Sequence, residues 1–261
     1  MMKFNHPYHL VSFSPWPLGM SFSLMFMLMG GLKYDFMLKI NLMLIGLISL
    51  LMCMFQWWRD VTRESTIQGD HTMEVVSGLK MGMLLFILSE LMFFVSFFWG
   101  YFHMYLSPSI DIGSLWVPKY LNIFDPYSIP LENTLILLSS GVSVTSCHYF
   151  IVNKNYKFAV LTLLETLLLG LIFIVMQYKE YCEASFTISD SIYGGVFFMM
   201  TGFHGMHVII GVVFLSINFI RLLIHHFSMF HHIGFEFAAW YWHFVDVVWL
   251  FLYMFIYWLP Y

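Results

Sequence analysis

Long apolar runs divide this chain into seven segments, and the short stretches between them hold most of its charged residues. Each run approaches or exceeds about 20 residues, the length that a helix needs to cross roughly 30 Å of hydrocarbon. The runs are continuously apolar and do not alternate with a period of two, which favours helices over barrel strands. The sequence therefore predicts seven transmembrane helices over residues 16–34, 40–58, 79–106, 131–152, 156–177, 191–222 and 233–258.

The composition agrees with this pattern and excludes several classes of protein. Of the 261 residues, 60% are hydrophobic and 10% are charged, whereas a typical soluble domain has about 25% charged residues. A soluble fold could not bury this much apolar surface, and a net charge of −4 provides no basic stripe for nucleic acid. The three cysteines have no spacing typical of a zinc module or a disulfide framework. We expect an all-α polytopic membrane protein with a single transmembrane domain over residues 1–261.

Basic residues are distributed unequally between the two sides that seven helices would define. Seven of the eleven Lys and Arg residues fall on the side of the N-terminus, which the positive-inside rule places in the matrix or cytoplasm. The abundance of Met (21) and Phe (29) fits AT-rich codons and a mitochondrial code that reads an isoleucine codon as Met. We therefore expect a multi-pass protein of the mitochondrial inner membrane, with its N-terminus in the matrix and its C-terminus in the intermembrane space.

Glu90 is the clearest candidate for chemistry. It lies about 14 Å into the third predicted helix at 1.5 Å per residue, with Phe86, Phe93, Phe94 and Phe97 around it at helical spacing. A charged acid at the centre of a span costs roughly 2.5–3.5 kcal/mol on insertion scales, and desolvation disfavours the charged form, so we expect a neutral acid. A role in proton transfer and a role as a hydrogen bond between helices both remain open.

The last two predicted helices carry a second group of polar side chains. Glu236 and His243 lie on one helix face, and Asp246 follows one turn later. His204 and His207 lie on the sixth helix. Histidines on two helices can ligate haem from both sides, but the sequence offers a single facing pair. We therefore predict that these five residues form polar contacts between helices.

Four histidines lie between the sixth and seventh predicted helices, on the side of the N-terminus. They are His225, His226, His231 and His232. Such a cluster can bind a metal ion, but in an interfacial loop it more often contacts lipid headgroups or titrates with pH. We expect no metal site and no cofactor in this chain.

Glu165, midway along the fifth helix, is a second isolated acid for which the sequence suggests no partner.

Four strings of residues carry information beyond composition. The first is WWRDVTREST at 57–66, followed by QG at 68–69 and HT at 71–72. The second is SE at 89–90 with the aromatic residues that follow it. The third runs from EA at 183–184 through FTISD at 186–190 to TGFHG at 201–205. The fourth combines HH at 231–232, GFE at 234–236 and WYWHFVDVVWLF at 240–251.

Together these strings resemble the subunit III family of cytochrome c oxidase, the mitochondrial form of the haem–copper oxidases, over essentially the whole chain. The resemblance implies that helices 1–2 and helices 3–7 form two groups, splayed into a V that holds phospholipids. It also implies a non-redox subunit with no catalytic residue, haem or copper of its own. The haem and copper belong to partner subunits, above all the catalytic subunit I, which reduces oxygen with electrons from cytochrome c and pumps protons.

The resemblance also assigns roles to particular residues. Glu90 matches the buried acid of the family, which is associated with proton uptake. Glu165 departs from the family pattern, because an apolar or hydroxyl residue is expected there. Two other functions compete with that of an oxidase subunit. One is a transporter or channel that uses Glu90, although no inverted repeat is visible, and the other is a haem-bearing membrane cytochrome. The expected contacts to lipid headgroups come from Trp58, Arg63, Glu64, His71 and Arg221.

Overall fold

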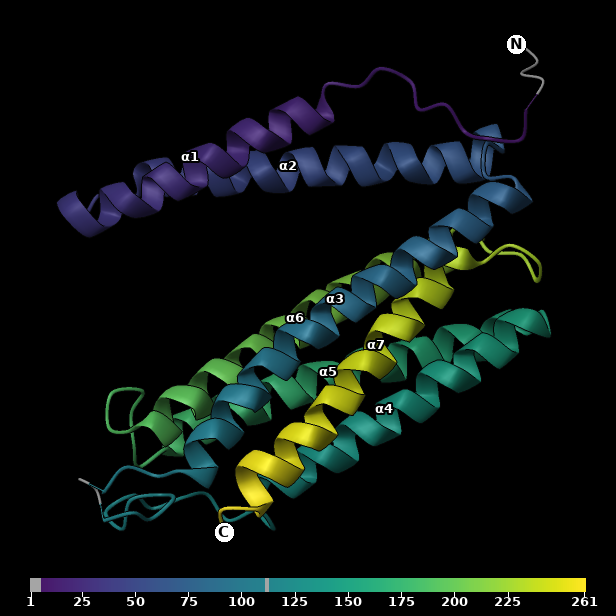
Figure 1. Cartoon of the computed structure of the whole chain (residues 1–261). Coiled ribbons are helices and arrows are strands. Elements are labelled where there is room, and N and C mark those ends of the chain that lie inside the picture. The colour runs from purple at the N-terminus through teal and green to yellow at the C-terminus, as the bar shows by residue number, and fades with distance from the viewer. Residues whose placement is uncertain (1–5, 111–112) are drawn as a thin grey trace. The chain divides into compact units, whose positions relative to one another are not determined.

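The computed structural model describes residues 6–110 and 113–261, and all regular secondary structure within them is helical. Seven long helices follow one another along these residues (Figure 1). This confirms the predicted all-α fold. The helices are α1 (Trp16–Met37), α2 (Asn41–Arg63), α3 (Met73–Leu106), α4 (Ile129–Val152), α5 (Tyr156–Glu183), α6 (Ile192–Leu223) and α7 (Ile233–Leu252); π-helical turns extend α2 over Glu64–Gln68 and α7 over Tyr253–Trp258.

Six helices of the described residues, α2 to α7, are long and apolar enough to cross a membrane. Helix α1 is not among them, although its 22 residues would extend about 33 Å at 1.5 Å per residue. Its sequence includes several Gly and Ser residues, and Lys33 and Asp35 lie near its end. That α1 also crosses the membrane stays a prediction.

Three helices extend by at least five residues beyond the bounds predicted from the apolar runs. Helix α2 continues past residue 58 to Arg63, α3 begins at Met73 in place of 79, and α5 continues past 177 to Glu183. The prediction ended each helix where charged residues begin. Backbone hydrogen bonds do not require apolar side chains, so a helix can continue beyond the hydrocarbon. The stretch 59–80 is therefore largely helical, with a break at Gly69, whose φ of 71° suits glycine.

The chain divides into two compact units, residues 1–79 and 80–261. The first unit contains α1 and α2, and the second contains most of α3 together with α4 to α7. This division agrees with the predicted grouping of the helices, whereas the V-shaped lipid cleft stays a prediction.

In the first unit, α1 and α2 lie side by side as an antiparallel pair (Figure 1). Two glycines allow their backbones to approach closely. A Cβ atom at Gly30 would lie 2.3 Å from the backbone nitrogen of Met43, and one at Gly46 would lie 2.4 Å from that of Met27. Small residues at such a crossing are typical of helix pairs in membranes, where close packing replaces the hydrophobic effect as the driving force.

The core of the second unit is centred on α7. The indole rings of Trp242 and Trp249 are almost completely buried, and Trp242 donates a hydrogen bond from Nε1 to Oγ of Ser140 on α4 at 2.8 Å. Gly170 on α5 and Gly211 on α6 leave room for this ring, because a Cβ at either position would lie within 3 Å of it. One tryptophan thus fixes the spacing of three neighbouring helices.

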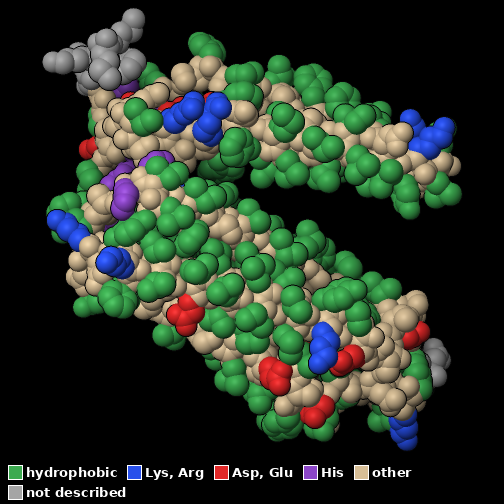
Figure 2. Space-filling model, turned by 180° about the vertical axis from the view of Figure 1, so that it is seen from behind, with side chains coloured by type: hydrophobic (Ala, Val, Ile, Leu, Met, Phe, Trp, Pro, Cys, Tyr) green, Lys and Arg blue, Asp and Glu red, His purple; other side chains and the backbone are tan. Residues whose placement is uncertain are grey.

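The outer faces of the helices are apolar. Large hydrophobic side chains are exposed along every helix of the described residues. They are spread over the face shown in Figure 2, where charged side chains are sparse. A soluble monomer rarely exposes contiguous apolar patches larger than a few hundred Å². These surfaces therefore suit lipid or partner helices.

Candidate functional site

Glu90 on α3 faces His207 on α6. Oε2 of Glu90 lies 3.0 Å from Nε2 of His207, and the two side chains are 26% and 12% exposed. The other imidazole nitrogen, Nδ1, lies 2.7 Å from the carbonyl oxygen of Phe203, one turn earlier on α6. The acid predicted to lie isolated in the third helix therefore has a histidine partner, 117 residues away in the sequence.

This geometry implies that the pair holds one shared proton. A carbonyl oxygen only accepts hydrogen bonds, so Nδ1 of His207 must carry a proton. Nε2 then either donates to a Glu90 carboxylate or accepts from a protonated Glu90 carboxyl, and in both forms the pair has no net charge.

Aromatic rings surround this pair. Ring centroids of Phe94 and Phe93 lie 5.1 and 6.5 Å from that of His207, and the ring of Tyr241 on α7 stacks on it at 6.3 Å. The sequence predicted the phenylalanines from their helical spacing. It did not predict Tyr241, because that contact depends on how α7 packs against α6. The rings restrict water and hold the imidazole in place.

A second group of polar side chains lies at the start of α7. Nζ of Lys80 on α3 lies 2.9 Å from Oε2 of Glu236, and Nε2 of His232 lies 3.4 Å from Oε1 of the same carboxylate. Nε2 of His148, near the end of α4, lies 3.0 Å from Nε2 of His232. Four segments thus meet at this point. His148 was not singled out from the sequence, because a single histidine near a helix end gives no signal of its distant partners.

Arg221 lies near the end of α6 and is half-buried. The central carbon of its guanidinium lies 4.8 Å from the ring centroid of Phe227, an arrangement that favours cation–π attraction. On another side the guanidinium approaches Gly234, where an added Cβ would lie 2.3 Å from Nη1. The glycine therefore leaves the space that this arginine occupies.

The remaining polar residues of α6 and α7 lie apart from these groups. His204 is 1% exposed and packs against the rings of Phe173 and Trp249, and neither of its nitrogens has a hydrogen-bond partner among the described residues. Nδ1 of His243 lies 4.0 Å from Oδ2 of Asp246. The five residues expected to form polar contacts between helices are thus distributed over separate places.

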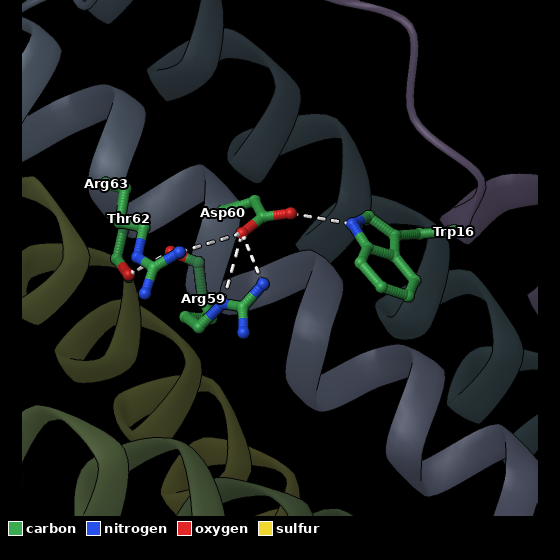
Figure 3. A network of polar contacts seen from close by, with 5 residues as sticks. All are labelled: Trp16, Arg59, Asp60, Thr62 and Arg63. Carbon is green, nitrogen blue, oxygen red and sulfur yellow. Dashed lines mark hydrogen bonds and ion pairs between the residues drawn. The ribbon is translucent and has the colours of Figure 1, made fainter.

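In the first unit, Asp60 near the end of α2 organises a polar network (Figure 3). Its Oδ2 accepts a hydrogen bond from Nε1 of Trp16 at 2.7 Å. Its Oδ1 accepts two hydrogen bonds from Arg59, at 3.1 and 3.0 Å, and lies 3.8 Å from Nη1 of Arg63. The indole of Trp16 thereby ties the start of α1 to the end of α2.

Beside this network is a pocket of about 300 Å³, lined by Arg63, Glu64, Gln68, Trp57 and the segment 11–16 among others. Oε2 of Glu64 lies 3.3 Å from Nε2 of His9, whose ring is 6.1 Å from that of His71. The structure therefore brings together three of the residues predicted to contact lipid, Arg63, Glu64 and His71. Trp58 does not line the pocket and is 61% exposed.

Two acids of α5 have contrasting surroundings. Glu165, midway along the helix, is exposed. Glu180 is fully buried and accepts a hydrogen bond at Oε2 from Nε2 of Gln177 at 3.1 Å. The sequence gave no reason to distinguish Glu180 from the surface acids near it, because its burial results from packing against other helices.

Comparison with known proteins identifies the family. Residues 6–261 match the model of the family described as cytochrome c oxidase subunit III. The chain belongs to this family. It is 55% identical to cytochrome c oxidase subunit 3 of Heterololigo bleekeri over 254 residues, covering 97% of this chain and 98% of the relative. It is 54% identical to the same subunit of Drosophila melanogaster over 254 residues, with 97% of each chain covered.

A third relative has a similar identity. Cytochrome c oxidase subunit 3 of Prototheca wickerhamii is 53% identical over 255 residues, with 97% of each chain covered. These matches confirm the resemblance that the four strings indicated.

Proposed function

We propose that the chain is a non-redox core subunit of cytochrome c oxidase, respiratory complex IV, in the mitochondrial inner membrane. It packs mainly against the catalytic subunit I, stabilises it, supports its proton uptake and binds structural phospholipids. The match to the subunit III family over residues 6–261 carries this proposal. The exposed apolar faces of the helices support it, because they suit partner helices and lipid tails.

Haem and copper belong to partner subunits in this proposal. The histidines of α6 support that assignment through the bonds they make. Both nitrogens of His207 face other partners, the Phe203 carbonyl and Glu90, and His204 is enclosed by Phe173 and Trp249. Axial ligation of haem needs a free imidazole nitrogen directed at the iron. Both nitrogens of His207 are occupied, and the rings of Phe173 and Trp249 fill the space beside His204, so neither histidine suits that role.

Support for proton uptake is assigned to Glu90 and His207. The two side chains share a proton in apolar surroundings, and acids at such positions in membranes are rarely retained without a function.

Phospholipid binding is assigned to the pocket beside Asp60 and to Arg221. The guanidinium of Arg63 lines the pocket and its side chain is 55% exposed, so it can reach a phosphate, for which arginine has a well-suited geometry. Glu64 also lines the pocket, and His9 lies between Glu64 and His71. The exposed Trp58 suits the lipid–water interface. These residues lie on the side of the N-terminus, which we assign to the matrix.

Removal of the chain from the purified oxidase tests this function. Detergent depletion should leave the haem and copper content of the remaining complex unchanged, slow its proton uptake and shorten its lifetime during turnover. Addition of the purified chain with phospholipid should restore both properties. Loss of haem together with the chain, or an unchanged lifetime after depletion, would contradict the proposal.

A further inference from the structure

The polar group at the start of α7 has the features of a metal site. His148, His232 and Glu236 each offer one ligand atom, and these atoms all lie within 4.8 Å of one another. We propose that the three side chains bind a divalent transition-metal ion of the Zn²⁺ class, which links the end of α4 to the start of α7. The site lies outside the groups assigned above to proton uptake and to lipid.

The distances between the ligand atoms suit zinc. Tetrahedral Zn²⁺ with bonds of about 2.0–2.2 Å places its ligand atoms about 3.3 Å apart. Nε2 of His148 lies 3.0 Å from Nε2 of His232, and Nε2 of His232 lies 3.4 Å from Oε1 of Glu236. Small side-chain rotations would complete the third edge. Two imidazoles and one carboxylate leave a fourth position for water.

Neighbouring groups hold the ligands in a suitable state. Nδ1 of His232 lies 3.0 Å from the carbonyl oxygen of Ser228, so Nδ1 carries the proton and Nε2 presents its lone pair. A hydrogen bond of this kind to the second nitrogen is usual for histidines that bind metals. The ring of His148 stacks on that of Phe235 at 6.1 Å with an interplanar angle of 17°, which restricts its rotation.

The charge of Lys80 affects the affinity of the site for a metal ion, and the exposure of His148 affects how an ion reaches it. Nζ of Lys80 holds Oε2 of Glu236 at 2.9 Å, which orients the carboxylate and leaves Oε1 towards His232. Its positive charge lowers the affinity for a cation, so we expect reversible binding. His232 is buried, but His148 is exposed, so an ion can reach the site from the side of the N-terminus. Zn²⁺ has no redox chemistry, and a metal here is compatible with a non-redox subunit.

The sequence alone led to the expectation of no metal in the cluster of residues 225–232. It treated the four histidines of the loop as one group, and it also expected no haem iron or copper at His148. The structure combines one member of the cluster, His232, with His148, which is 84 residues away, and with Glu236 on the next helix. The chemistry of the proposed site therefore comes from packing of α4 against α7.

Zinc binding by the intact membrane complex that contains the chain tests the proposal. The complex is treated with a chelator and then titrated with radioactive Zn²⁺, and the variant His148→Gln is compared with the unsubstituted complex. We expect the variant to lose one zinc ion per complex, or to bind it at least about tenfold more weakly, since even loss of an outer-shell partner costs 10–100-fold. The matched control is His231→Gln, a histidine of the same loop outside the site, which should bind zinc as the unsubstituted complex does.

A second measurement keeps the test independent of folding. X-ray absorption at the zinc edge should show two imidazoles at about 2.0–2.1 Å in the unsubstituted complex. In His148→Gln it should show one imidazole where zinc is still bound, or no zinc at this site. Equal zinc affinity and an equal spectrum in the two complexes would overturn the proposal, as would loss of the ion in His231→Gln alone. If the His148→Gln complex fails to assemble, Glu236→Gln takes its place and the same comparison applies. This substitution keeps the side-chain volume and an oxygen that can accept a hydrogen bond from Lys80, and it removes only the negative charge.

Discussion

His207 on α6 lies 3.0 Å from the carboxyl group of Glu90 on α3 through its Nε2 atom. Because its Nδ1 atom carries a proton that it donates to the Phe203 carbonyl, one further proton lies between Nε2 and the carboxyl group and belongs to either residue. The arrangement places an acid and a base in a membrane helix bundle without a net charge, which is the least costly way to keep titratable groups there.

Replacement Glu90→Gln should remove the exchangeable proton and preserve the contact. The amide of Gln can donate to Nε2 of a neutral His207, so the packing of α3 against α6 should be kept. If the pair supports proton uptake, the variant complex should take up protons more slowly and show an altered pH profile of turnover. If the pair only holds helices together, Glu90→Gln should be silent and Glu90→Ala should weaken assembly.

A matched control exists for this substitution. Glu165 is also a membrane-embedded acid, but it is exposed on α5 and is not part of the pair. Glu165→Gln should leave the pH profile of turnover as it is. A similar change in both variants would show that the effect comes from loss of any acid along these helices, and the role of Glu90 would be refuted.

Addition of one methyl group at Gly211 should destabilise the helix bundle. A Cβ at this position would lie 2.8 Å from the ring of Trp242, and the ring cannot retreat because it is buried and hydrogen-bonded to Ser140. We expect Gly211→Ala to cost about 1–3 kcal/mol, as overpacking does. Thermal inactivation of the complex measures this. Gly205→Ala on the same helix, where nothing lies within 4 Å, should be tolerated, and equal losses in both variants would contradict the packing account.

Replacement Arg63→Gln should reduce the amount of phospholipid that remains with the purified complex. The guanidinium lines the pocket next to Asp60, and its loss removes a charged hydrogen-bond donor to phosphate. Phosphorus analysis and mass spectrometry of extracted lipids measure the change. Lys154→Gln, in the turn between α4 and α5 on the same side, serves as the control. Retention of the full lipid content by Arg63→Gln would remove this arginine from the proposed headgroup site.

The orientation of the chain can be tested through Cys182. Its thiol is free and exposed at the end of α5, whereas that of Cys147 is buried. With the N-terminus in the matrix, the end of α5 lies on the intermembrane side, so a membrane-impermeant maleimide should label the chain in mitoplasts. The variant Cys182→Ser should not be labelled. Labelling that requires opening of the inner membrane would reverse the proposed topology.

Much of the fold could be predicted from the sequence, because apolar length alone fixes where a helix crosses a membrane. Helix ends were less predictable where the helix continues into polar residues, as α2 does to Arg63 and α5 to Glu183. Glu90 could be identified from the cost of burying an acid, but its partner could not. His207 and Glu90 are 117 residues apart, and only the packing of α3 against α6 brings them together.

Packing between helices that are distant in the sequence also explains which residues of the other sites could not be predicted. His148 and Glu180 carry no local signal, because the partner of the first, His232, lies 84 residues away and the burial of the second comes from tertiary packing. Conversely, His204 has the spacing of a polar contact with α7 but packs against aromatic rings. Periodicity gives the face of a helix, and it does not give the neighbour that the face will meet.

Co-purification tests the central claim most directly. The chain carries an affinity tag at its C-terminus, mitochondrial membranes are solubilised in a mild detergent, and the eluate is examined by optical spectroscopy and mass spectrometry. We predict that a haem–copper catalytic subunit elutes with the chain in equal amount, with the absorption of its haem. Elution of the chain without haem, or with partners unrelated to an oxidase, would contradict the account.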